Sequence, residues 1–436
     1  MQELLRKLDE PSRREFITCA ARAFLGVSLI PVGGAATALA APLDARNKAK
    51  AQSIIYLFMQ GGMSHIDTFD TKPDRRDVQG PTETIATKLD GMRISGYLPM
   101  LAKHGPKMAI VRSMSHTQGA HEQGVHKVRT GYEKLPGLTY PALGSWLARL
   151  SGREMRAGLP PYIHVGGLGG HPGSGFLEAK YGPVPVDDPN SGLRNTRLVR
   201  GETLTNIQKR IDLAGKLDGA FIQRYGTDDV KAYADLYADA AKLIESKALE
   251  AFDLNKEKEE TRYSYGQDGF GQGVLLARRL VENGAQFVEV DLGGWDTHTN
   301  NHQGVSARAA VLDKAVSALL DDLAQRGLLE TTLVAIVSEF GRSPELDGQA
   351  GRNHHPIAFS TVLAGGGVRP QVYGATNDTG REVAENKVSV HDFNATIAHL
   401  MGVNPAAPVV VPGGRALTLA GPDTSPNRGK PIAALI

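Results

Sequence analysis

The sequence predicts an α/β protein in which strands and helices build a layered sheet. Short, continuous apolar runs alternate along the chain with longer amphipathic stretches, as expected when strands are joined by helices. Many of the 50 glycines stand directly after the apolar runs, where they indicate sharp turns at strand ends. The net charge of +2 and the apolar fraction of 41% favour a globular chain and do not indicate a nucleic-acid binder or a membrane protein.

The N-terminal 42 residues are predicted to be a removable twin-arginine signal peptide. The pair Arg13-Arg14 precedes a moderately apolar stretch from Ile17 to Leu39, and small residues at 38–40 suit a cleavage site. An ordinary amphipathic helix is the alternative, but Pro31 and the glycines at 33–34 break the segment too often for a core helix or a stable membrane anchor. We therefore expect the twin-arginine translocase as a partner and a periplasmic or secreted destination in a bacterium.

The chain contains a single cysteine, Cys19, and it lies inside the predicted signal peptide. The mature chain would then have no disulfide, no thiolate metal ligand and no cysteine nucleophile. Thiol chemistry is excluded on this basis.

Four apolar runs are predicted to be buried strands, and four amphipathic stretches are predicted to be helices. The strands are Ser53–Met59, Met108–Arg112, Phe287–Leu292 and Thr332–Val337, and the helices are Asn206–Lys216, Asp229–Phe252, Gly271–Asn283 and Ala307–Arg326. The region from about 194 to 260 is highly charged and lacks a strand pattern. We interpret it as a helical insertion or lid on a single domain that covers residues 43–436.

Polar residues that follow the predicted strands are the candidates for a functional site, because ligands bind where the strands of an α/β sheet end. After the first strand, the stretch 61–70 supplies two glycines, Ser64, His65 and Asp67. Its backbone N–H groups could contact an anion, while His65 and Asp67 could bind a metal or orient another group. A tight turn capped by Asp67 or Asp70 is the alternative.

Three histidines fall within eleven residues after the second strand, at His116, His121 and His126. His121 and His126 are five residues apart and would not share one helical face squarely. We expect His126 to be structural, whereas His116 and His121 precede a predicted helix and are better site candidates.

Asp296 and His298 follow the strand Phe287–Leu292 and its two glycines. At positions i and i+2 of an extended segment they can face one centre, and their oxygen and nitrogen donors suit zinc or manganese. An Asp-Thr-His turn that is capped by its own backbone is the alternative.

Glu339 follows the last predicted strand, and Arg342, Arg352 and His354 come soon after it. A carboxylate at the end of a buried strand costs free energy unless it is paired or metal-bound. The two arginines could bind a tetrahedral oxyanion such as phosphate or sulfate. A salt bridge between Glu339 and one of these arginines is the alternative, and it would require no metal.

These stretches together resemble a known family, the domain of unknown function 1501 proteins. The matching motifs are GGMSHIDTFD, VRSMSH with HKVRTG, GGWDTH, SEFGRSP with GRNHHP, and VHDFNATIAHLMG. The family often carries twin-arginine signals and is similar to the alkaline phosphatase and sulfatase superfamily. The resemblance implies a three-layer α/β/α sandwich with a metal-centred, ester-hydrolysing site at the C-terminal edge of the sheet.

The resemblance also implies which residues hold the metal, namely Asp67, Asp296, His298, Glu339 and His354. Two positions depart from the superfamily pattern. Glu339-Phe340 replaces the usual Asp-His pair, and His121 stands nine residues before Thr130, where a sulfatase has its nucleophile. Histidine cannot become formylglycine, so Ser64, Ser115, Thr117 or a water molecule would have to attack the ester.

The sequence thus favours an exported hydrolase of phosphate or sulfate esters that uses a divalent ion such as zinc, manganese or calcium. Its substrate would be a small-molecule or glycan ester, with His121 as general acid, general base or further ligand. Ser64 is a candidate nucleophile, and Arg342 or Arg352 would stabilise the oxyanion. The alternative is a non-catalytic exported binding or assembly protein that keeps the same fold.

Overall fold

The structure is a computed structural model that describes residues 49–152, 158–193, 246–411, 413–422 and 428–436, and also positions 206, 209 and 243. The predicted signal peptide lies outside these residues. So do the predicted helix Asn206–Lys216, apart from its two described positions, and most of Asp229–Phe252. The last residues of that second range form a 3-10 helix, η3 (Lys247–Phe252).

An eight-stranded sheet forms the centre of the molecule, in the order β12-β4-β11-β8-β1-β7-β5-β6. Its strands are β1 (Ser53–Met59), β4 (Met108–Met114), β5 (Tyr162–Val165), β6 (Val184–Val186), β7 (Phe287–Leu292), β8 (Thr332–Val337), β11 (Phe359–Gly365) and β12 (Gln371–Tyr373). All of these strands run in one direction except β11, which is antiparallel to both of its neighbours.

Shorter strands form four small sheets around the central one. They are β2 (Thr84–Ala86) with β3 (Arg93–Ser95), β9 (Gly341–Arg342) with β10 (His354–His355), β13 (Ala375–Thr376) with β14 (Val383–Glu385), and β15 (Val409–Val410), β16 (Ala416–Thr418) and β17 (Gly421–Pro422).

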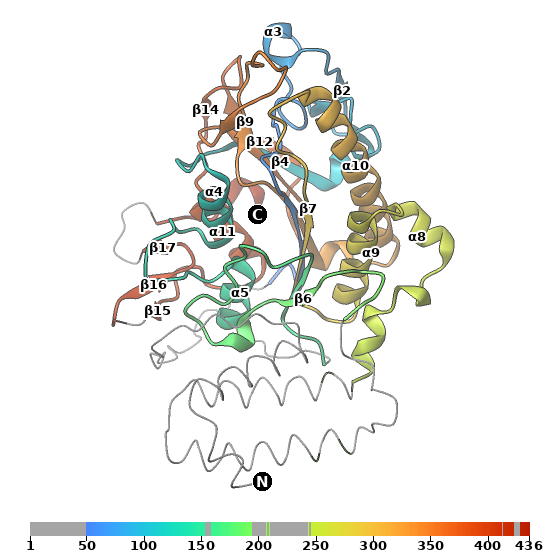
Figure 1. Ribbon diagram of the computed structural model, residues 1–436, viewed down its shortest axis with the longest axis vertical. Helices are drawn as coiled ribbons and strands as arrows, with labels where there is room; N and C mark the ends of the chain where they lie inside the picture. The colour runs from blue at the N-terminus through green and yellow to red at the C-terminus, as the bar shows by residue number, and fades with distance from the viewer. Residues whose placement is uncertain are drawn as a thin grey trace, which may run out of the picture.

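Helices cover both faces of the central sheet, so the molecule has three layers (Figure 1). The α-helices are α3 (Arg76–Gln79), α4 (His121–Thr130), α5 (Leu143–Ser151), α8 (Glu259–Tyr265), α9 (Gly269–Glu282), α10 (Asn301–Gln325) and α11 (Val390–Leu400). The 3-10 helices besides η3 are η1 (Leu101–Lys107), η2 (Ala179–Tyr181), η4 (Leu254–Lys256), η5 (Leu329–Thr331) and η6 (Ala433–Leu435). In Figure 1, α8, α9 and α10 lie on one side of the sheet and α4, α5 and α11 on the other. The predicted α/β/α sandwich is confirmed.

Strand β1 shows why the predicted strands read as unbroken apolar runs. Ile55, Leu57 and Met59 belong to the core under α9 and α10, while Tyr56 and Phe58 belong to the core under α5 and α11. A strand covered on both faces has no solvent side and therefore no polar alternation. The predicted ranges for β1, β7 and β8 are confirmed residue for residue, and β4 extends two residues beyond its prediction.

The helix predictions on either side of β7 are also confirmed, with shifted ends. Helix α9 begins two residues before the predicted range because Asp268 caps it, accepting a hydrogen bond from the Gly271 N–H at 2.9 Å. Helix α10 begins at Asn301, six residues before the predicted start. Four strands of the central sheet were not predicted, β5, β6, β11 and β12, because they are short or contain serine, threonine or proline.

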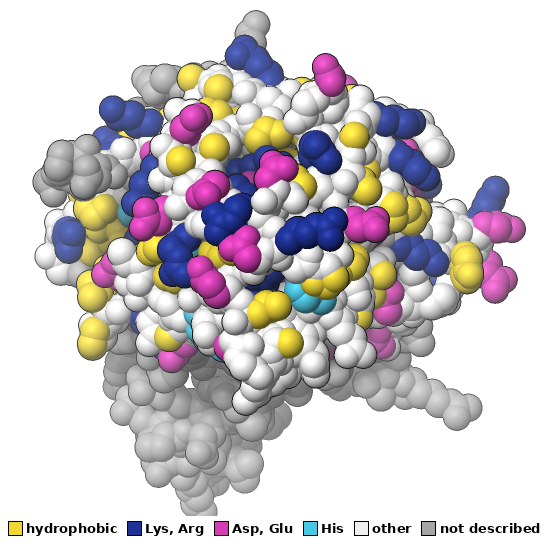
Figure 2. All heavy atoms as spheres, turned by 90° about the horizontal axis from the view of Figure 1, so that it is seen from above, with side chains coloured by type: hydrophobic (Ala, Val, Ile, Leu, Met, Phe, Trp, Pro, Cys, Tyr) yellow, Lys and Arg dark blue, Asp and Glu magenta, His cyan; other side chains and the backbone are white. Residues whose placement is uncertain are grey.

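Positive and negative side chains are interspersed on the face seen in Figure 2. Two ion pairs of the described chain join distant segments: Arg75, next to α3, lies 2.6 Å from Asp378, and Arg381 pairs with Glu345. Within the described part of the chain, no helix is long and apolar enough to cross a membrane.

Candidate metal centre

Three adjacent strands end together and bring their following loops to one place. Strand β1 lies between β7 and β8, with Met59 paired to Leu292 and Phe58 paired to Val337. The segments after these strands, 60–63, 293–298 and 338–342, therefore meet at the C-terminal edge of the sheet. This edge is where ligands bind in open α/β sheets.

Two glycines allow these loops to approach one another closely. Gly61 and Gly62 both have positive φ angles, of 119° and 82°, which L side chains rarely adopt. A Cβ atom on Gly61 would lie 2.5 Å from the Asp296 backbone nitrogen, and one on Gly62 would lie 2.6 Å from the Phe340 ring. The missing side chains thus let the β1 loop pack directly against the Asp296 segment.

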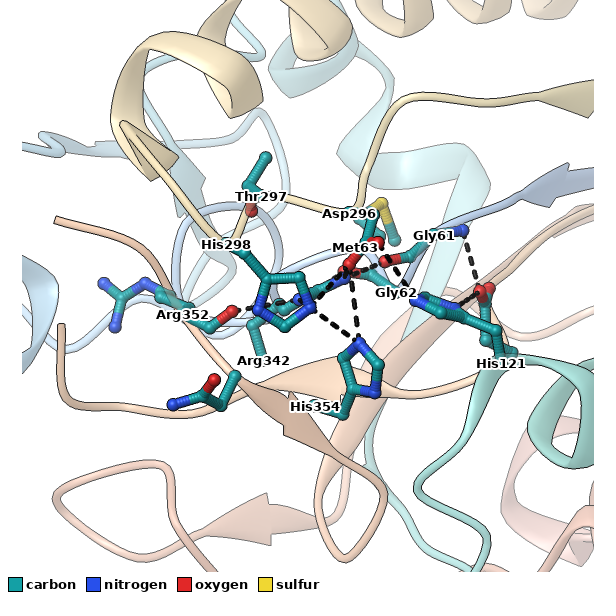
Figure 3. A network of polar contacts seen from close by, with 12 residues as sticks. Gly61, Gly62, Met63, His121, Asp296, Thr297, His298, Arg342, Arg352 and His354 are labelled. Atoms are coloured by element: carbon teal, nitrogen blue, oxygen red, sulfur yellow. Dashed lines mark hydrogen bonds and ion pairs between the residues drawn. The ribbon is translucent and has the colours of Figure 1, made fainter. Parts of the chain in front are cut away.

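Four predicted site residues converge at this edge, namely His121, Asp296, His298 and His354 (Figure 3). One ligand atom from each lies within 4.8 Å of those from the other three. Asp296 is central: its Oδ1 lies 3.0 Å from His298 Nε2 and 3.4 Å from His354 Nε2, and its Oδ2 lies 3.2 Å from His121 Nε2. The two ring nitrogens of His298 and His354 are 2.9 Å apart. We call these four residues the histidine–aspartate cluster.

Two of the imidazole rings are oriented through their outer nitrogens. His354 Nδ1 lies 2.7 Å from the Gly119 carbonyl oxygen, and His121 Nδ1 lies 2.9 Å from Glu339 Oε1. Both partners are acceptors, so each Nδ1 carries the hydrogen and each Nε2 directs a lone pair into the cluster in the neutral ring. Ring orientation of this kind is typical of metal-binding histidines.

Local secondary structure places these side chains. His121 is the first residue of α4, and His354 lies on β10, where the antiparallel pairing sets it opposite Arg342 of β9. Glu339 is fully buried behind His121, and its Oε1 also accepts the Gly61 N–H at 2.7 Å. Glu339 therefore contacts the cluster through His121.

Arg342 is fully buried beneath Asp296. Its guanidinium donates to Asp296 Oδ1 and to the Gly61 carbonyl, its Nε donates to the Gly62 carbonyl at 3.0 Å, and its Nη1 donates to the Arg352 carbonyl at 2.9 Å. These bonds hold Asp296 in place and fill the positions of the fork that an oxyanion would need.

The charges and hydrogen bonds in the cluster shift the pKa values of Asp296, His121 and His354. Partial burial raises the pKa of Asp296, but Arg342, His121 and His298 outweigh burial and hold this pKa at about 2. The hydrogen bond from His121 to Glu339 raises the pKa of His121. Burial, together with the charges of Arg342 and His121, lowers the pKa of His354. The site thus combines an ionised carboxylate with a neutral imidazole, and both can donate to a divalent cation.

Asp67, Ser64 and Arg352 lie outside the histidine–aspartate cluster, in a network of their own. Arg352 Nε and Nη2 lie 2.8 and 3.1 Å from the two carboxylate oxygens of Asp67, and both side chains are fully buried. Ser64 donates to Asp67 at 2.6 Å and Asn301 donates to it at 2.8 Å. Burial raises the pKa of Asp67, but Arg352 and these hydrogen bonds outweigh burial and lower this pKa below its ordinary value. Asp67 is therefore an ionised carboxylate that links the loops.

The remaining predicted candidates are held by backbone groups. Both ring nitrogens of His116 are engaged, Nε2 with the Glu339 carbonyl at 2.6 Å and Nδ1 with the Gln118 N–H at 3.0 Å. Burial lowers the pKa of His116 to about 4. His126 contacts the Tyr132 carbonyl at 3.1 Å. Both residues lie outside the cluster.

Sequence reasoning missed a second buried polar network, which involves Arg129 of α4, His164 of β5, and Glu289 and Asp291 of β7. A pattern in the sequence was available to find it. Glu289 and Asp291 alternate within the apolar run FVEVDL, so they share one face of a buried strand and require partners.

Several solved structures are similar to this chain at low sequence identity. A protein in the alkaline phosphatase superfamily from Vibrio parahaemolyticus is 10% identical, with a TM-score of 0.36 over 91% of this chain and 76% of that one. The PsFucS1 sulfatase from Pseudoalteromonas sp. is 13% identical, with a TM-score of 0.38 over 87% and 73%. The alkaline phosphatase of the Antarctic bacterium TAB5 is 10% identical, with a TM-score of 0.35 over 82% and 99%.

Sequence comparison gives the family more directly. No curated protein matches the sequence. One family matches residues 51–429, which is most of the chain, and its description is "Protein of unknown function (DUF1501)". The chain belongs to this family.

Proposed function

We propose that the protein is an exported, metal-dependent hydrolase of phosphate or sulfate esters, with a divalent ion held by the histidine–aspartate cluster. The observation that carries the proposal is the inward direction of the imidazole lone pairs around Asp296. His121 and His354 each donate a hydrogen bond from Nδ1 to an outer acceptor, and their Nε2 atoms lie 3.2 and 3.4 Å from the Asp296 carboxylate. A cation shared by these imidazole nitrogens and the Asp296 carboxylate would stabilise lone pairs that lie this close together.

The donor set also favours particular ions. Three imidazole nitrogens and one carboxylate suit zinc or manganese, whereas calcium prefers six to eight oxygen ligands. Of the three ions expected from the sequence, we therefore propose zinc or manganese.

An ion at this site would supply Lewis acidity toward the ester and activate water as the nucleophile. The chain's own residues hold the ligands: Glu339 orients His121, and Arg342 orients Asp296. In this proposal Glu339 is a positioning residue, because its Oε1 is already engaged by His121 and by the Gly61 N–H. Asp67 and Arg352 stabilise the loops around the site.

Metal analysis with matched variants tests the proposal. We expect the purified protein to bind about one equivalent of zinc or manganese, because four ligands suffice for a tetrahedral site. His354→Ala should lose the metal together with hydrolysis of aryl phosphates, phosphodiesters or sulfates, and Glu339→Gln should weaken metal binding by about 10–100-fold. His399→Gln, on α11 and outside the cluster, serves as the control. A wild-type protein free of metal, or turnover unchanged in His354→Ala, would contradict the proposal.

A non-catalytic binding or assembly protein is the second candidate. It is favoured by the place of the hydroxyl predicted to attack: Ser64 is buried and donates to Asp67, outside the cluster. The same assay separates the two functions. Metal binding without turnover on any of the three ester classes would favour a binding role, and metal-dependent turnover would exclude it.

A further inference from the structure

A buried polar network separate from the histidine–aspartate cluster lies between helix α4 and the neighbouring strands β5 and β7. Helix α4 lies on one side of the central sheet that contains β7 (Figure 1), and Arg129 of α4 pairs with two carboxylates of β7. The Arg129 guanidinium lies 4.2 Å from the centre of the Phe58 ring and is 4% exposed. We call Arg129, Tyr162, His164, His171, Glu289 and Asp291 the Arg129 network.

Arg129 holds one oxygen of each carboxylate on β7. Its Nε donates to Glu289 Oε1 and its Nη2 donates to Asp291 Oδ1, both at 2.8 Å. The second oxygen of each carboxylate is thereby turned toward the histidines and needs a donor of its own.

On the Glu289 side, the donors and acceptors match with neutral groups. The Gly173 N–H donates to His171 Nδ1 at 3.0 Å, so the ring hydrogen of neutral His171 is on Nε2. His171 Nε2 lies 2.9 Å from the Tyr162 hydroxyl, which in turn donates to Glu289 Oε2. These hydrogen bonds satisfy every donor and acceptor on the Glu289 side without a further proton or ion.

On the Asp291 side, every acceptor has a hydrogen-bond donor only if His164 is protonated on both ring nitrogens. His164 Nδ1 lies 3.2 Å from the Gly166 carbonyl oxygen, and Nε2 lies 3.2 Å from Asp291 Oδ2. Both partners accept hydrogen bonds, since one is a carbonyl oxygen and the other belongs to the carboxylate that pairs with the Arg129 guanidinium. A neutral His164 has only one N–H and would set a lone pair against one of these oxygens.

The charge balance gives the same answer. Glu289 and Asp291 contribute two negative charges and Arg129 one positive charge, so a second positive charge makes the buried network neutral. A divalent ion between His164, His171 and Glu289, whose donor atoms lie within 4.8 Å of one another, would instead leave an excess positive charge in a buried place. It would also compete with the Nε2 hydrogen of His171.

We infer that His164 is a buried imidazolium whose ion pair with Asp291 completes the Arg129 network and, through Arg129, fixes α4 against β7. Eight residues separate Arg129 from His121, about 12 Å along the helix. Strand β7 leads after Asp291 into the segment that carries Asp296. The network therefore sets the relative position of two cluster residues, and this positioning role rests on the proposed function.

The groups that face His164 support this assignment. Burial lowers the pKa of His164, but the hydrogen bond to Asp291 and the charges of Glu289 and Asp291 outweigh burial and the opposing charge of Arg129, and raise the pKa above its ordinary value. His171 and Tyr162 complete the surroundings as neutral groups, since burial lowers the pKa of His171 and raises that of Tyr162. With a raised folded-state pKa, the stability from His164 is complete below about pH 6.5 and is lost as pH rises through the folded-state pKa.

Histidine nitrogen NMR tests the protonation directly. In wild-type protein labelled with ¹⁵N-histidine, we expect an imidazolium resonance at pH 7.5 that is absent from His164→Gln and present in the control His399→Gln. The melting-temperature gap between wild type and His164→Gln should narrow from pH 6.5 to pH 9, because only the wild type has this proton to lose. Should His164→Gln fail to fold, Asp291→Asn replaces it, and the His164 resonance should then become that of a neutral ring at pH 7.5.

Zinc titration tests the positioning role. The affinity ratio of wild type to His164→Gln should exceed one at pH 6.5 and fall toward one at pH 9, since ligand protonation affects both proteins equally. A neutral His164 ring in the wild type, a pH-independent melting gap, or a second equivalent of metal lost in His164→Gln would each overturn the inference. A wild type that binds no zinc would refute the proposed function while the NMR result still decides the charge of His164.

Discussion

At Gly61 and Gly62, the absence of a Cβ atom decides whether the cluster can form. Both residues have positive φ, and both pack where a side chain would overlap the Asp296 segment or the Phe340 ring. The carbonyl oxygens of the same two residues accept hydrogen bonds from Arg342, which holds Asp296. The glycine pair thus links backbone conformation to the position of a proposed metal ligand.

Gly62→Ala should destabilise the protein more than a matched glycine variant. Gly62 and Gly91 have similar φ angles, 82° and 74°, but a Cβ on Gly91 meets nothing within 4 Å. Gly91→Ala should cost about 1–2 kcal/mol for the left-handed backbone alone. Gly62→Ala should cost about 2–5 kcal/mol, because the fully buried Phe340 ring must also move. Denaturant unfolding measures both, and equal free energies for the two variants would show that the Phe340 contact is unimportant.

The Asp67–Arg352 pair shows that an arginine near a predicted site can pair with a buried carboxylate instead of binding an oxyanion. An arginine close to a predicted anion site suggests oxyanion binding, yet Arg352 pairs with a carboxylate that is itself fully buried. Breaking such a pair by removing one partner costs about 3–5 kcal/mol. Which role an arginine takes depends on the nearest carboxylate in space, and Asp67 is 285 positions away in the sequence.

Among the elements, the small β9–β10 pair matters most for the site. Each strand has two residues, too few for any apolar pattern, yet the pairing sets His354 opposite Arg342. Strand β11 was missed for a related reason: its sequence, FSTVLAG, mixes hydroxyls into the apolar run, and its reversed direction has no local cause. Both depend on neighbours that are distant in sequence.

Helix α11 is an element whose start the sequence does specify. Ser389 accepts the Asp392 N–H at 3.1 Å, and Asp392 accepts the Ser389 N–H at 2.9 Å, which forms a capping box. Asp392 thus stabilises the first turn of α11 as the N3 residue of the capping box.

Ser389→Ala should lower the free energy of unfolding by about 1 kcal/mol, since an N-cap hydrogen bond is lost. Ser306→Ala, within α10 and with its hydroxyl donating to the Gln303 carbonyl of the same helix, should change stability by about 0.5 kcal/mol or less. Thermal or denaturant unfolding provides the comparison. If the two variants were equally stable, the capping box would make no net contribution.

For the whole molecule, buried polar groups are set within a large apolar core, with the histidine–aspartate cluster at the C-terminal edge of the central sheet and the Arg129 network between α4, β5 and β7. The histidine–aspartate cluster takes His121 from α4, Asp296 and His298 from the loop after β7, and His354 from β10, so it exists only in the folded chain. We propose that this explains the twin-arginine signal predicted from the sequence, because the translocase exports folded proteins and a selected metal could be bound before export.

Replacing Arg13 and Arg14 with lysine should leave most of the protein in the cytoplasm of its bacterial host, whereas wild type should appear in the periplasm or medium. Cell fractionation measures the distribution, and Arg22→Lys, later in the same predicted signal, is the control. Rerouting the mature chain through an exporter of unfolded proteins should lower its metal content. Equal metal content by both routes would show that folding before export is not required for metal loading.

The sequence by itself determined the α/β class, the strands β1, β7 and β8, and the candidate residues His121, Asp296, His298 and His354, because buried strands and polar loop residues leave local patterns. Only the tertiary structure decided which candidates share a site. It set Glu339 behind His121, paired Asp67 with Arg352, and joined His164 to Arg129 through two carboxylates of β7. Hydrogen bonds and ion pairs act over about 3 Å in space, and the chain brings such partners together from hundreds of positions apart.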